Sequence, residues 1–234
     1  MDDMDSVAKV EIENNSFQKN LTPQQTEAVK TLSELRGFVP TLLYGVTGSG
    51  KTEVYIRCIQ EQLLQQKSVL LLAPEIALTP QLEQRVKDQF GPAVGMYHSI
   101  MTPAKRYKAW KQFRSGEINI LIGTRSAAMM SAPKLGLIII DEEHDASYKQ
   151  HEGFKFSARD LAIKRAQMLK IPIIIGTATP SLRTLRLVDE KKFGLIKLTK
   201  RITKQNPPKF SILDINETPL TNELHLDQRQ LQQL

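Results

Sequence analysis

The sequence predicts an α/β fold, in which a mostly parallel, doubly wound sheet carries helices on both faces. Short runs rich in Val, Ile and Leu recur along the chain with little polar alternation, which is typical of strands covered on both faces. Amphipathic helical patterns lie between these runs, and alternating strands and helices indicate a parallel sheet. A glycine-rich loop between one such run and the next helical pattern is a third indication of this class.

The composition is that of an ordinary globular chain. Its 234 residues are enough for a substantial core, and 41% of them are apolar and 24% charged. No apolar run reaches the roughly 18 residues that a membrane span needs, and the acidic start of the chain is unlike a secretory signal. Cys58 is the only cysteine, so neither a disulfide framework nor a zinc site is expected. We therefore expect a cytoplasmic protein without zinc.

The net charge of +7 is unevenly distributed along the chain. Residues 1–20 are polar with a local charge of −3, and we interpret them as a disordered or linker arm. Residues 155–209 carry a local charge of +11, more than the surplus of the whole chain. This basic segment fits a surface that faces a polyanion, and on charge alone it fits solvated, lysine-rich helix faces about as well.

Several helices can be placed by their start signals. Thr22 suits a helix N-cap, Pro23 the first helical position and Gln25 the third, so Thr22 and Gln25 can form a capping box. A further helix is predicted over residues 53–66. The same Thr-Pro signal predicts helix starts at residues 79–80, 102–103 and 179–180.

The strands define one domain, which we assign to residues 21–203. After residue 204 the pattern weakens, and residues 204–234 are interpreted as a C-terminal extension with a strand-like run at 210–213 and a helix at 222–234. The predicted strands cover residues 41–44, 68–73, 94–97, 118–122, 137–140, 171–175 and 194–198.

The central motif is a glycine-rich loop between the first strand and the helix that follows it. Strand, loop and helix in this order are the context of a phosphate-binding loop. Its glycines let backbone N–H groups surround a phosphate, and the helix N-terminus favours an anion. Lys51 is expected to meet the β- and γ-phosphates of a nucleotide and the Thr52 hydroxyl to bind Mg²⁺. The residues expected to hold the nucleotide are Gly45, Gly48, Ser49, Gly50, Lys51 and Thr52.

A second polar group follows the apolar run at residues 135–140, where the sequence reads Asp141-Glu142-Glu143-His144. Carboxylates at the carboxyl end of a buried parallel strand point into the crevice where such sheets bind ligands. Asp141 can complete a Mg²⁺ site with Thr52, and Glu142 can orient or deprotonate an attacking water. We interpret Glu143 as an ordinary exposed acid. Lys51, Asp141 and Glu142 are thus the candidate catalytic residues.

The motifs in this order resemble the first motor lobe of the primosomal replication-restart DNA helicases, a family of superfamily 2. The Asp-Glu-Glu-His-Asp run is specific to this family beyond helicases generally. The resemblance covers about residues 21–213. It implies a RecA-like P-loop NTPase domain of an ATP-dependent 3′-to-5′ DNA helicase. The matching segments are Gly45 to Tyr55, Ala73 to Gln81, His98-Ser99, Gly123 to Ala127, Asp141 to Gln150 and Gly176 to Pro180.

The resemblance also implies roles for individual residues. Gln25 would read the adenine of ATP, a role compatible with its place in a capping box. His144, Thr177 and Thr179 would couple the nucleotide state to DNA. The residues implied on the DNA side of the lobe are Pro74, Thr79, Thr124 and Arg125.

Aromatic and basic residues interleave after the acidic motif, and this segment resembles the loop that senses single-stranded DNA in the family. Aromatic faces can stack bases while cations hold the phosphate backbone. Core packing of the aromatics is the alternative, and we favour a loop because Ser157, with Asp160 three residues on, is a helix N-cap signal. The residues concerned are Tyr148, Lys149, Phe154, Lys155 and Phe156.

Features of the intact family are missing from the sequence. No residue after Leu213 matches the second lobe with its ATP-site arginine, and one cysteine cannot build the paired zinc sites. We expect an excised lobe that binds ATP and Mg²⁺ weakly and lacks helicase activity. In the intact chain the partners would be single-stranded or forked DNA, the second lobe, and primosome and single-strand-binding proteins. The alternative is a nucleic-acid or partner-binding P-loop module whose ATPase is vestigial.

Overall fold

The structure is a computed structural model that describes residues 20–74 and 80–202. The chain divides into two compact units, Met1–Ile202 and Thr203–Leu234, and all described residues belong to the first. The strand-like run at 210–213 and the helix predicted over 222–234 lie outside the described residues, as do Thr79 and the predicted arm up to residue 19.

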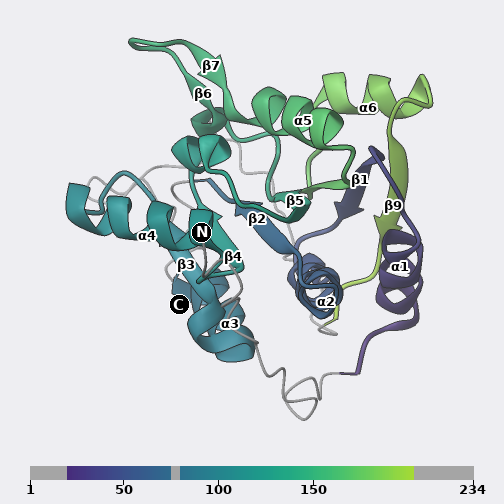
Figure 1. Ribbon diagram of the computed structural model, residues 1–234. Coiled ribbons are helices and arrows are strands. Elements are labelled where there is room, and N and C mark those ends of the chain that lie inside the picture. The colour runs from purple at the N-terminus through teal and green to yellow at the C-terminus, as the bar shows by residue number, and fades with distance from the viewer. Residues whose placement is uncertain (1–19, 75–79, 203–234) are drawn as a thin grey trace, which may run out of the picture. The chain divides into compact units, whose positions relative to one another are not determined.

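One sheet of seven strands forms the centre of the first unit (Figure 1), and all of its strand pairs are parallel. The spatial order is β3-β4-β2-β5-β8-β1-β9, so chain neighbours are often separated by a crossover. The predicted α/β class with a doubly wound parallel sheet is confirmed. The strands are β1 (Pro40–Gly45), β2 (Ser68–Leu72), β3 (Val94–Tyr97), β4 (Ile120–Gly123), β5 (Leu135–Ile140), β8 (Ile173–Thr177) and β9 (Gly194–Leu198).

Helices cover both faces of this sheet. The first face carries α1 (Pro23–Ser33), α2 (Lys51–Leu64) and α3 (Pro80–Phe90), whose apolar residues join one buried cluster. The second face carries α4 (Pro103–Ser115), α5 (Ala158–Leu169) and α6 (Leu182–Asp189), which contribute to the other. Within β2, Val69 and Leu71 face the first cluster while Leu70 and Leu72 face the second. All four are fully buried, as expected for a strand covered on both sides.

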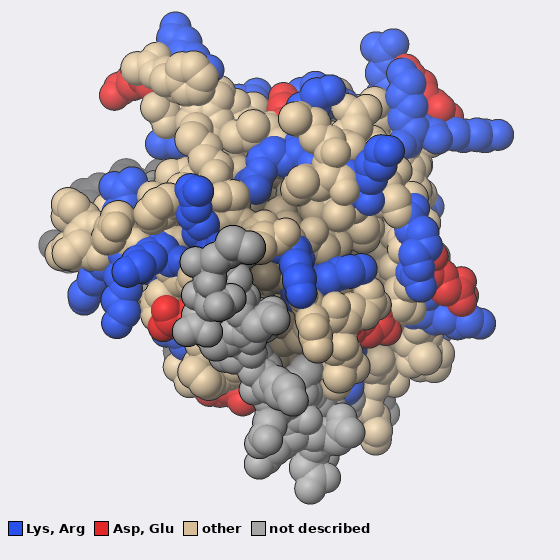
Figure 2. Space-filling view, in the orientation of Figure 1, with Lys and Arg blue, Asp and Glu red and all other residues tan. Residues whose placement is uncertain are grey.

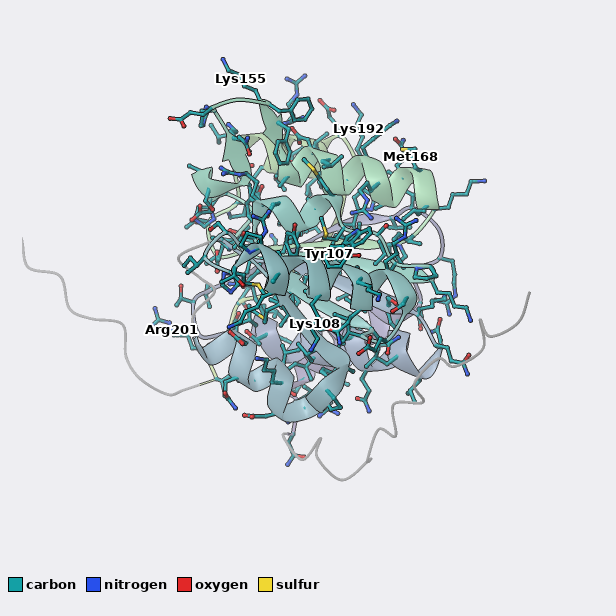
Figure 3. All side chains as sticks on the ribbon, turned by 60° about the vertical axis from the view of Figure 1, so that its left-hand side comes forward. Tyr107, Lys108, Lys155, Met168, Lys192 and Arg201 are labelled. Atoms are coloured by element: carbon teal, nitrogen blue, oxygen red, sulfur yellow. The ribbon has the colours of Figure 1, made fainter. Side chains whose placement is uncertain are left out.

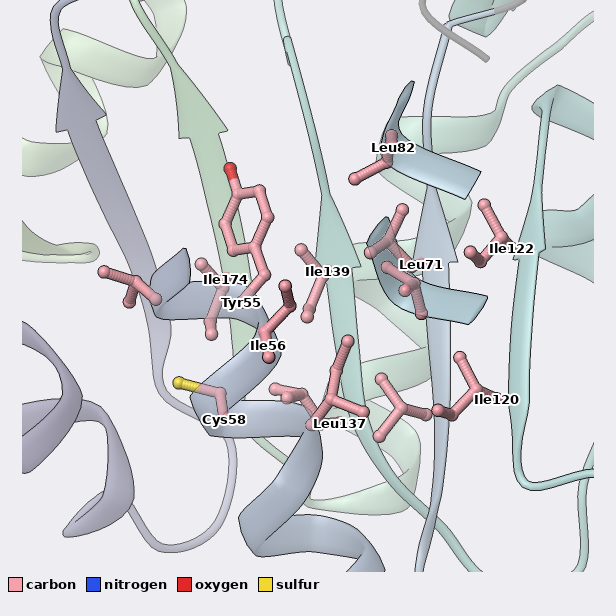
Figure 4. Close-up of a cluster of buried hydrophobic side chains, with 14 of the residues drawn as sticks. Tyr55, Ile56, Cys58, Leu71, Leu82, Ile120, Ile122, Leu137, Ile139 and Ile174 are labelled. Carbon is pink, nitrogen blue, oxygen red and sulfur yellow. The ribbon is translucent and has the colours of Figure 1, made fainter. Parts of the chain in front are cut away.

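The cluster between α2 and the sheet is shown in Figure 4. Tyr55, Ile56 and Cys58 of α2 pack there against Ile139 and Ile174 of the strands. Burying each such aliphatic side chain contributes about 1.5–3 kcal/mol. Burial also raises the pKa of the Cys58 thiol, so this cysteine packs as a small apolar group. The result is a rigid layer that fixes the loops at both ends of the strands.

Most predicted helix starts are confirmed. Thr22 and Gln25 form the capping box ahead of α1, and the Thr102 side chain accepts a hydrogen bond from the Lys105 N–H at the start of α4. The start at Pro80 is also found. The start predicted at Thr179-Pro180 is wrong, because Ser181 is the N-cap of α6 and its side chain accepts from the Thr184 N–H.

Four predicted elements begin two residues away from the predicted position. Strand β5 begins at Leu135 rather than at 137. The helix after the glycine-rich loop begins at Lys51 rather than residue 53, since Gly50 (φ 80°) already ends the loop. Strands β4 and β8 begin at Ile120 and Ile173 rather than at 118 and 171. The reason is that the N–H groups of Ile118 and Ile171 bond to carbonyls near the ends of the preceding helices, Gln112 and Ala166.

None of the described helices is long and apolar enough to cross a membrane.

Candidate nucleotide site and DNA-facing edge

The candidate site lies at the edge of the sheet where the parallel strands end. The phosphate-binding loop follows β1, the acidic motif follows β5, and the Thr177–Thr179 segment follows β8. Because β8 lies between β5 and β1, the strand order brings all three segments to one place. Open α/β sheets bind their ligands outside the carboxyl ends of such strands.

The glycine-rich loop has the backbone that a phosphate cradle needs. Gly48 (φ 79°) and Gly50 (φ 80°) are left-handed, a conformation that other residues adopt at a cost. A Cβ at Gly45 would lie 2.5 Å from Ser49 Oγ, so the loop closes tightly on itself. Ser49 Oγ is buried and has no hydrogen-bond partner among the described residues. The loop backbone therefore fits the phosphates of a nucleotide, and the Ser49 hydroxyl remains available for a further hydrogen bond.

Lys51 joins the glycine-rich loop to the acidic motif. Its Nζ donates to the Gly45 carbonyl at 3.0 Å and lies 3.4 Å from Glu142 Oε1. The side chain is only 10% exposed. The lysine and the strand-end acids are thus on the same side of the sheet and close together, as a shared nucleotide site requires.

Glu142 has an unusual backbone. Its φ is +43°, in the left-handed region that residues other than glycine seldom adopt. Such a conformation costs roughly 1–3 kcal/mol and persists at functional sites where the surroundings enforce it. Its Oε2 lies 3.5 Å from both Thr177 Oγ1 and the Ala178 N–H. The Glu142 carboxylate therefore lies at the carboxyl ends of β5 and β8.

Asp141 is held by a tyrosine that sequence reasoning missed. The hydroxyl of Tyr55 on α2 donates to Asp141 Oδ1 at 2.9 Å. Tyr55 is fully buried, and its hydroxyl points toward the carboxyl ends of the strands (Figure 4). Burial raises the pKa of Asp141, while the Tyr55 hydrogen bond and Lys51 lower it. A Cβ at Gly176 would lie 1.6 Å from the Tyr55 oxygen, which explains the glycine in β8.

Tyr148 was assigned to the DNA side, and the structure corrects this. Tyr148 is 2% exposed, so its ring cannot stack on a base. Its hydroxyl lies 2.6 Å from the Asp141 carbonyl and 3.0 Å from the Leu72 carbonyl. With one proton to donate, it bonds most strongly to Asp141, the nearer acceptor. Tyr148 thus secures the backbone of the acidic motif.

The expected Mg²⁺ ligands fit that ion chemically. Mg²⁺ takes oxygen ligands and commonly binds one or two carboxylates, with waters and substrate phosphates completing its shell. Asp141 supplies a carboxylate at the strand end, and Thr52 is the second residue of α2, directly after Lys51. The described residues contain no group of three His, Cys, Asp or Glu side chains that could hold a metal ion.

The three residues predicted to couple nucleotide and DNA contact one another. His144 Nδ1 lies 2.9 Å from Thr177 Oγ1 and 3.2 Å from Thr179 Oγ1. His144 Nδ1 is also 3.7 Å from Glu142 Oε2. The acidic motif and the segment after β8 therefore form one polar group beside the candidate catalytic acid. Their coupling role itself stays a prediction.

Glu143 is not the exposed acid that we predicted. It is 3% exposed, and its Oε2 lies 2.8 Å from Arg159 Nε on α5. Its Oε1 accepts from the Ser181 N–H at 2.8 Å, and Arg159 donates to Thr184 at 2.6 Å. The prediction failed because the sequence around Glu143 does not indicate that the fold brings Arg159, 16 residues later, next to this acid.

Gln25 is buried against the phosphate-binding loop. Its Nε2 donates to the Ser49 carbonyl at 3.0 Å, and its Oε1 accepts from the Thr22 N–H. The capping-box role is confirmed by these contacts. Recognition of adenine by the same side chain stays a prediction, although the side chain does lie at the site.

Of the residues implied on the DNA side, Pro74 and Thr124 are buried and Arg125 is half-buried. Pro74 is buried and offers no surface to DNA. Thr124 and Arg125 line a polar cavity of about 150 Å³ with Ser99, Arg106, Ser126, Ser147 and Gln150. Arg125 Nη1 also donates to the carbonyls of Ser147 and Lys149, at 3.3 and 3.0 Å. This arginine therefore ties the cavity to the segment that follows the acidic motif.

That segment forms a short antiparallel hairpin rather than an irregular loop (Figure 1). Strands β6 (Lys149–Gln150) and β7 (Phe156–Ser157) pair in it, and Ser157 caps α5 as predicted. Phe154 at the tip is 75% exposed, with its ring 6.0 Å from that of Phe156. Lys149 and Lys155 are also exposed. Of the three aromatics, only Phe154 points outward with Lys149 and Lys155, while Tyr148 is buried and Phe156 packs partly against the core, as the alternative of core packing predicted.

A family model of DEAD/DEAH box helicases matches residues 22–188. The chain belongs to this family. The solved structure of RecG bound to a three-way DNA junction covers 81% of this chain with a TM-score of 0.59 at 22% identity. The helicase domain of Pyrococcus furiosus Hef covers 80% with a TM-score of 0.56 at 18% identity. At such identities the likeness shows the fold, which is the RecA-like one expected.

Curated relatives narrow the resemblance to one kind of helicase. The replication restart protein PriA of Haemophilus influenzae is 44% identical over 87% of this chain and 28% of its own length. PriA of Bacillus subtilis is 40% identical over 75% of this chain and 22% of its own length. The chain therefore spans about a quarter of the length of these relatives.

Proposed function

We propose that the chain is the ATP-binding lobe of an ATP-dependent 3′-to-5′ DNA helicase that acts in replication restart and primosome assembly. The observation that carries this proposal is the approach of Lys51 Nζ to Glu142 Oε1 at 3.4 Å, beside a phosphate cradle. The polarity of unwinding follows only from the resemblance to the family.

The residues around the cradle bind the nucleotide. Backbone N–H groups of the loop and the N-terminus of α2 face the phosphates, and Lys51 exchanges its bond to Gly45 for a bond to phosphate oxygen. Thr52 and Asp141 would hold Mg²⁺, and the hydrogen bond from Tyr55 fixes the orientation of the aspartate. The ion would supply positive charge beside the transferred phosphoryl group.

Glu142 orients the attacking water and accepts its proton. His144, Thr177 and Thr179 contact this acid or one another, so a shift of the segment after β8 changes the position of the carboxylate. In the intact protein, closure of the second lobe on single-stranded or forked DNA supplies that shift. Arg125 and the hairpin residues Lys149, Phe154 and Lys155 face the DNA. Thr124 is buried and Phe156 packs partly against the core, so we do not place them on the DNA.

The 234-residue chain by itself binds ATP and Mg²⁺ weakly and does not unwind DNA. The second lobe completes the ATP site with an arginine in the family, and loss of such an arginine in GTPases costs about 10³–10⁵ in rate. We also propose that the intact protein is cytoplasmic and works with primosome and single-strand-binding proteins.

The test is made in the intact protein with Lys51→Ala and Glu142→Gln. Each substitution should abolish unwinding, and Glu142→Gln should retain nucleotide binding, because the amide keeps the shape of the acid but cannot accept a proton. Unwinding of DNA by either variant would contradict the proposal.

The alternative is a nucleic-acid or partner-binding module with a vestigial nucleotide pocket. A module that does not hydrolyse ATP does not require Lys51 close to the acidic motif or the left-handed backbone of Glu142. We therefore favour the working ATP site.

A further inference from the structure

Helix α4 is a strongly basic element outside the site described above. Its 13 residues include five cations and no acid. This helix lies outside the basic segment of residues 155–209. The five cations are Lys105, Arg106, Lys108, Lys111 and Arg114.

The outward face of α4 carries three of these cations. Ala109 and Phe113 are buried and fix which side of the helix packs on the sheet. Lys108, Lys111 and Arg114 follow one another at intervals of three, which places them along the opposite, exposed side. Figure 3 shows this helix facing the viewer, with Lys108 and Tyr107 on it and Lys155 of the hairpin above. The three cations span about 9 Å of helix.

These charges have no counterions within the described part of the chain. Some cations on other helices are paired with acids, as Lys87 is with Glu83 in α3 and Arg186 with Glu190 in α6, whereas Lys30 of α1 and Lys164 of α5 form no ion pair with a described acid. No described acid forms an ion pair with a cation of α4. Like charges three or four residues apart destabilise a helix. The arrangement therefore costs stability unless an external polyanion offsets it.

The aromatic residues of α4 are occupied with one another. The rings of Tyr107 and Trp110 lie 5.6 Å apart, and the Arg114 guanidinium lies over Trp110 at 5.4 Å. Tyr107 is nevertheless 63% exposed, compared with 75% for Phe154 at the hairpin tip, whose ring lies against that of Phe156. The α4 face differs from the hairpin tip in its row of three exposed cations, which suits a phosphate backbone.

Helix α4 borders the proposed DNA side of the lobe through Arg106, which is half-buried on the packed side of the helix, whereas Lys108, Lys111 and Arg114 lie on its outer side. Arg106 lines the same cavity as Arg125, and its buried Nε has no hydrogen-bond partner among the described residues. Figure 2 shows basic side chains on the side where Figure 1 places α4 and also at the hairpin. Because Arg106 of α4 and Gln150 of the hairpin line the same cavity, the cavity lies between the helix and the base of the hairpin.

We propose that α4 binds the phosphate backbone of duplex DNA through Lys108, Lys111 and Arg114. A rigid, convex helix with evenly spaced cations matches the regular backbone of a duplex, and the hairpin receives the adjoining single strand. The inference rests on the proposed function only in taking DNA as the substrate. The inference assigns the double-stranded part of the DNA to the exposed face of α4.

The experiment measures how duplex affinity depends on salt for the 234-residue chain. Each phosphate contact to B-DNA contributes about −0.9 to the slope of log affinity against log salt. The triple variant Lys108→Ala, Lys111→Ala, Arg114→Ala should lose about 2.7 from this slope, if each cation makes one contact. The matched control is Lys67→Ala, Lys134→Ala, Lys170→Ala. It removes the same charge from the amino-terminal edge of the sheet, where these exposed lysines line another cavity.

A reduced slope in the α4 variant, with the control at wild-type slope and binding of a single-stranded oligonucleotide unchanged, is the expected result. Equal losses in both variants would make the effect one of net charge and overturn the inference. So would an unchanged slope, an equal loss on single-stranded DNA, or duplex binding too weak to measure in the wild type.

Two further measurements separate the effect on DNA binding from changes in stability and in nucleotide binding. Alanine favours helix more than Lys or Arg, so the α4 variant should melt no lower than the wild type. Stabilisation by MgATP is recorded on the same samples. A retained MgATP effect with an unchanged duplex slope refutes the role of α4 alone, while a missing MgATP effect in the wild type refutes the nucleotide site.

Discussion

Two tyrosine hydroxyls fix the acid that we expect to hold Mg²⁺. Tyr55 bonds the side chain of Asp141 at 2.9 Å, and Tyr148 bonds its backbone carbonyl at 2.6 Å. Both tyrosines are buried, and the nearby acids help to raise their pKa values, so each remains a neutral donor. A ligand held in this way loses little freedom when a cation binds.

We predict that Tyr55→Phe weakens Mg²⁺-dependent nucleotide binding. The phenyl ring keeps the packing of α2 but cannot donate to Asp141, and loss of such a supporting bond typically costs 10–100-fold in metal affinity. The Mg²⁺ concentration for half-maximal binding of a fluorescent ATP analogue should therefore rise by about tenfold or more.

Tyr107→Phe is the matched control, since Tyr107 is 63% exposed on α4. It should leave the Mg²⁺ dependence unchanged. Equal Mg²⁺ dependence in Tyr55→Phe and wild type would show that the Tyr55 hydrogen bond does not position Asp141.

Glu143 and Arg159 form a buried ion pair that links the acidic motif to α5 and α6. Removing one member of such a pair leaves a buried charge without compensation, which typically costs 3–5 kcal/mol. Arg159→Met should therefore lower the free energy of unfolding by about that amount in urea titrations.

The exposed pair of Arg186 and Glu190 gives the comparison, because Arg186 is 80% exposed at its side chain. Arg186→Met should cost no more than about 0.5 kcal/mol. Similar losses in the two variants would mean that the Glu143–Arg159 pair contributes no more than a surface contact.

Among the elements, the hairpin of β6 and β7 stands directly beside the acidic motif. Tyr148 immediately precedes β6, and Arg125 bonds the carbonyls on either side of this tyrosine. The base of the hairpin is thus tied both to the candidate nucleotide site and to the polar cavity. Its tip, with Phe154, is free of these bonds and is presented outward.

We predict that Phe154→Ala weakens binding of single-stranded DNA. Stacking of a base on an aromatic side chain is worth about 1–3 kcal/mol, so affinity should fall roughly 5- to 150-fold. Fluorescence anisotropy of a labelled oligonucleotide measures this directly.

Leu182→Ala serves as the control, because Leu182 is 86% exposed on α6 and lies outside the proposed DNA face. It should bind DNA as the wild type does. A Phe154→Ala variant with unaltered affinity would remove the hairpin tip from the DNA path.

Elements that carry their own local signal could be predicted from the sequence. The cap at Thr22 and the loop before Lys51 are recognisable within a few residues, and the position of Asp141 follows from the rule for parallel strand ends. What could not be predicted depends on strand order and helix rotation. Tyr55 meets Asp141 across 86 residues, and neither position marks the other in the sequence.

The same distinction explains the errors. Thr179 has the helix-start signal, but its hydroxyl contacts His144, which leaves Ser181 to cap α6. Tyr148 has the composition of an exposed aromatic segment, yet it faces the core between β2 and β5. In both residues a tertiary contact overrides a sound local preference.

At the scale of the whole first unit, the two edges of the sheet differ in chemistry. The carboxyl edge brings together the phosphate-binding loop, the acidic motif and the segment after β8. The amino edge has a cavity lined by Arg36, Lys67, Lys134 and Lys170, and three of these follow the carboxyl ends of α1, α2 and α5. Cations are favourable at such helix ends, so this cluster is explained without a ligand. Within residues 20–74 and 80–202, only the carboxyl edge combines a phosphate cradle with strand-end acids.

The central claim is that this edge forms one site for MgATP, and thermal unfolding with and without MgATP tests it most directly. At a hundred times its dissociation constant, a ligand that binds only the folded chain adds about 2.7 kcal/mol. For a chain of this size that raises Tm by roughly 5–11 °C. The account predicts such a rise for the wild type and none for Lys51→Ala. An unchanged Tm for the wild type at saturating MgATP, or an equal rise in the variant, would contradict it.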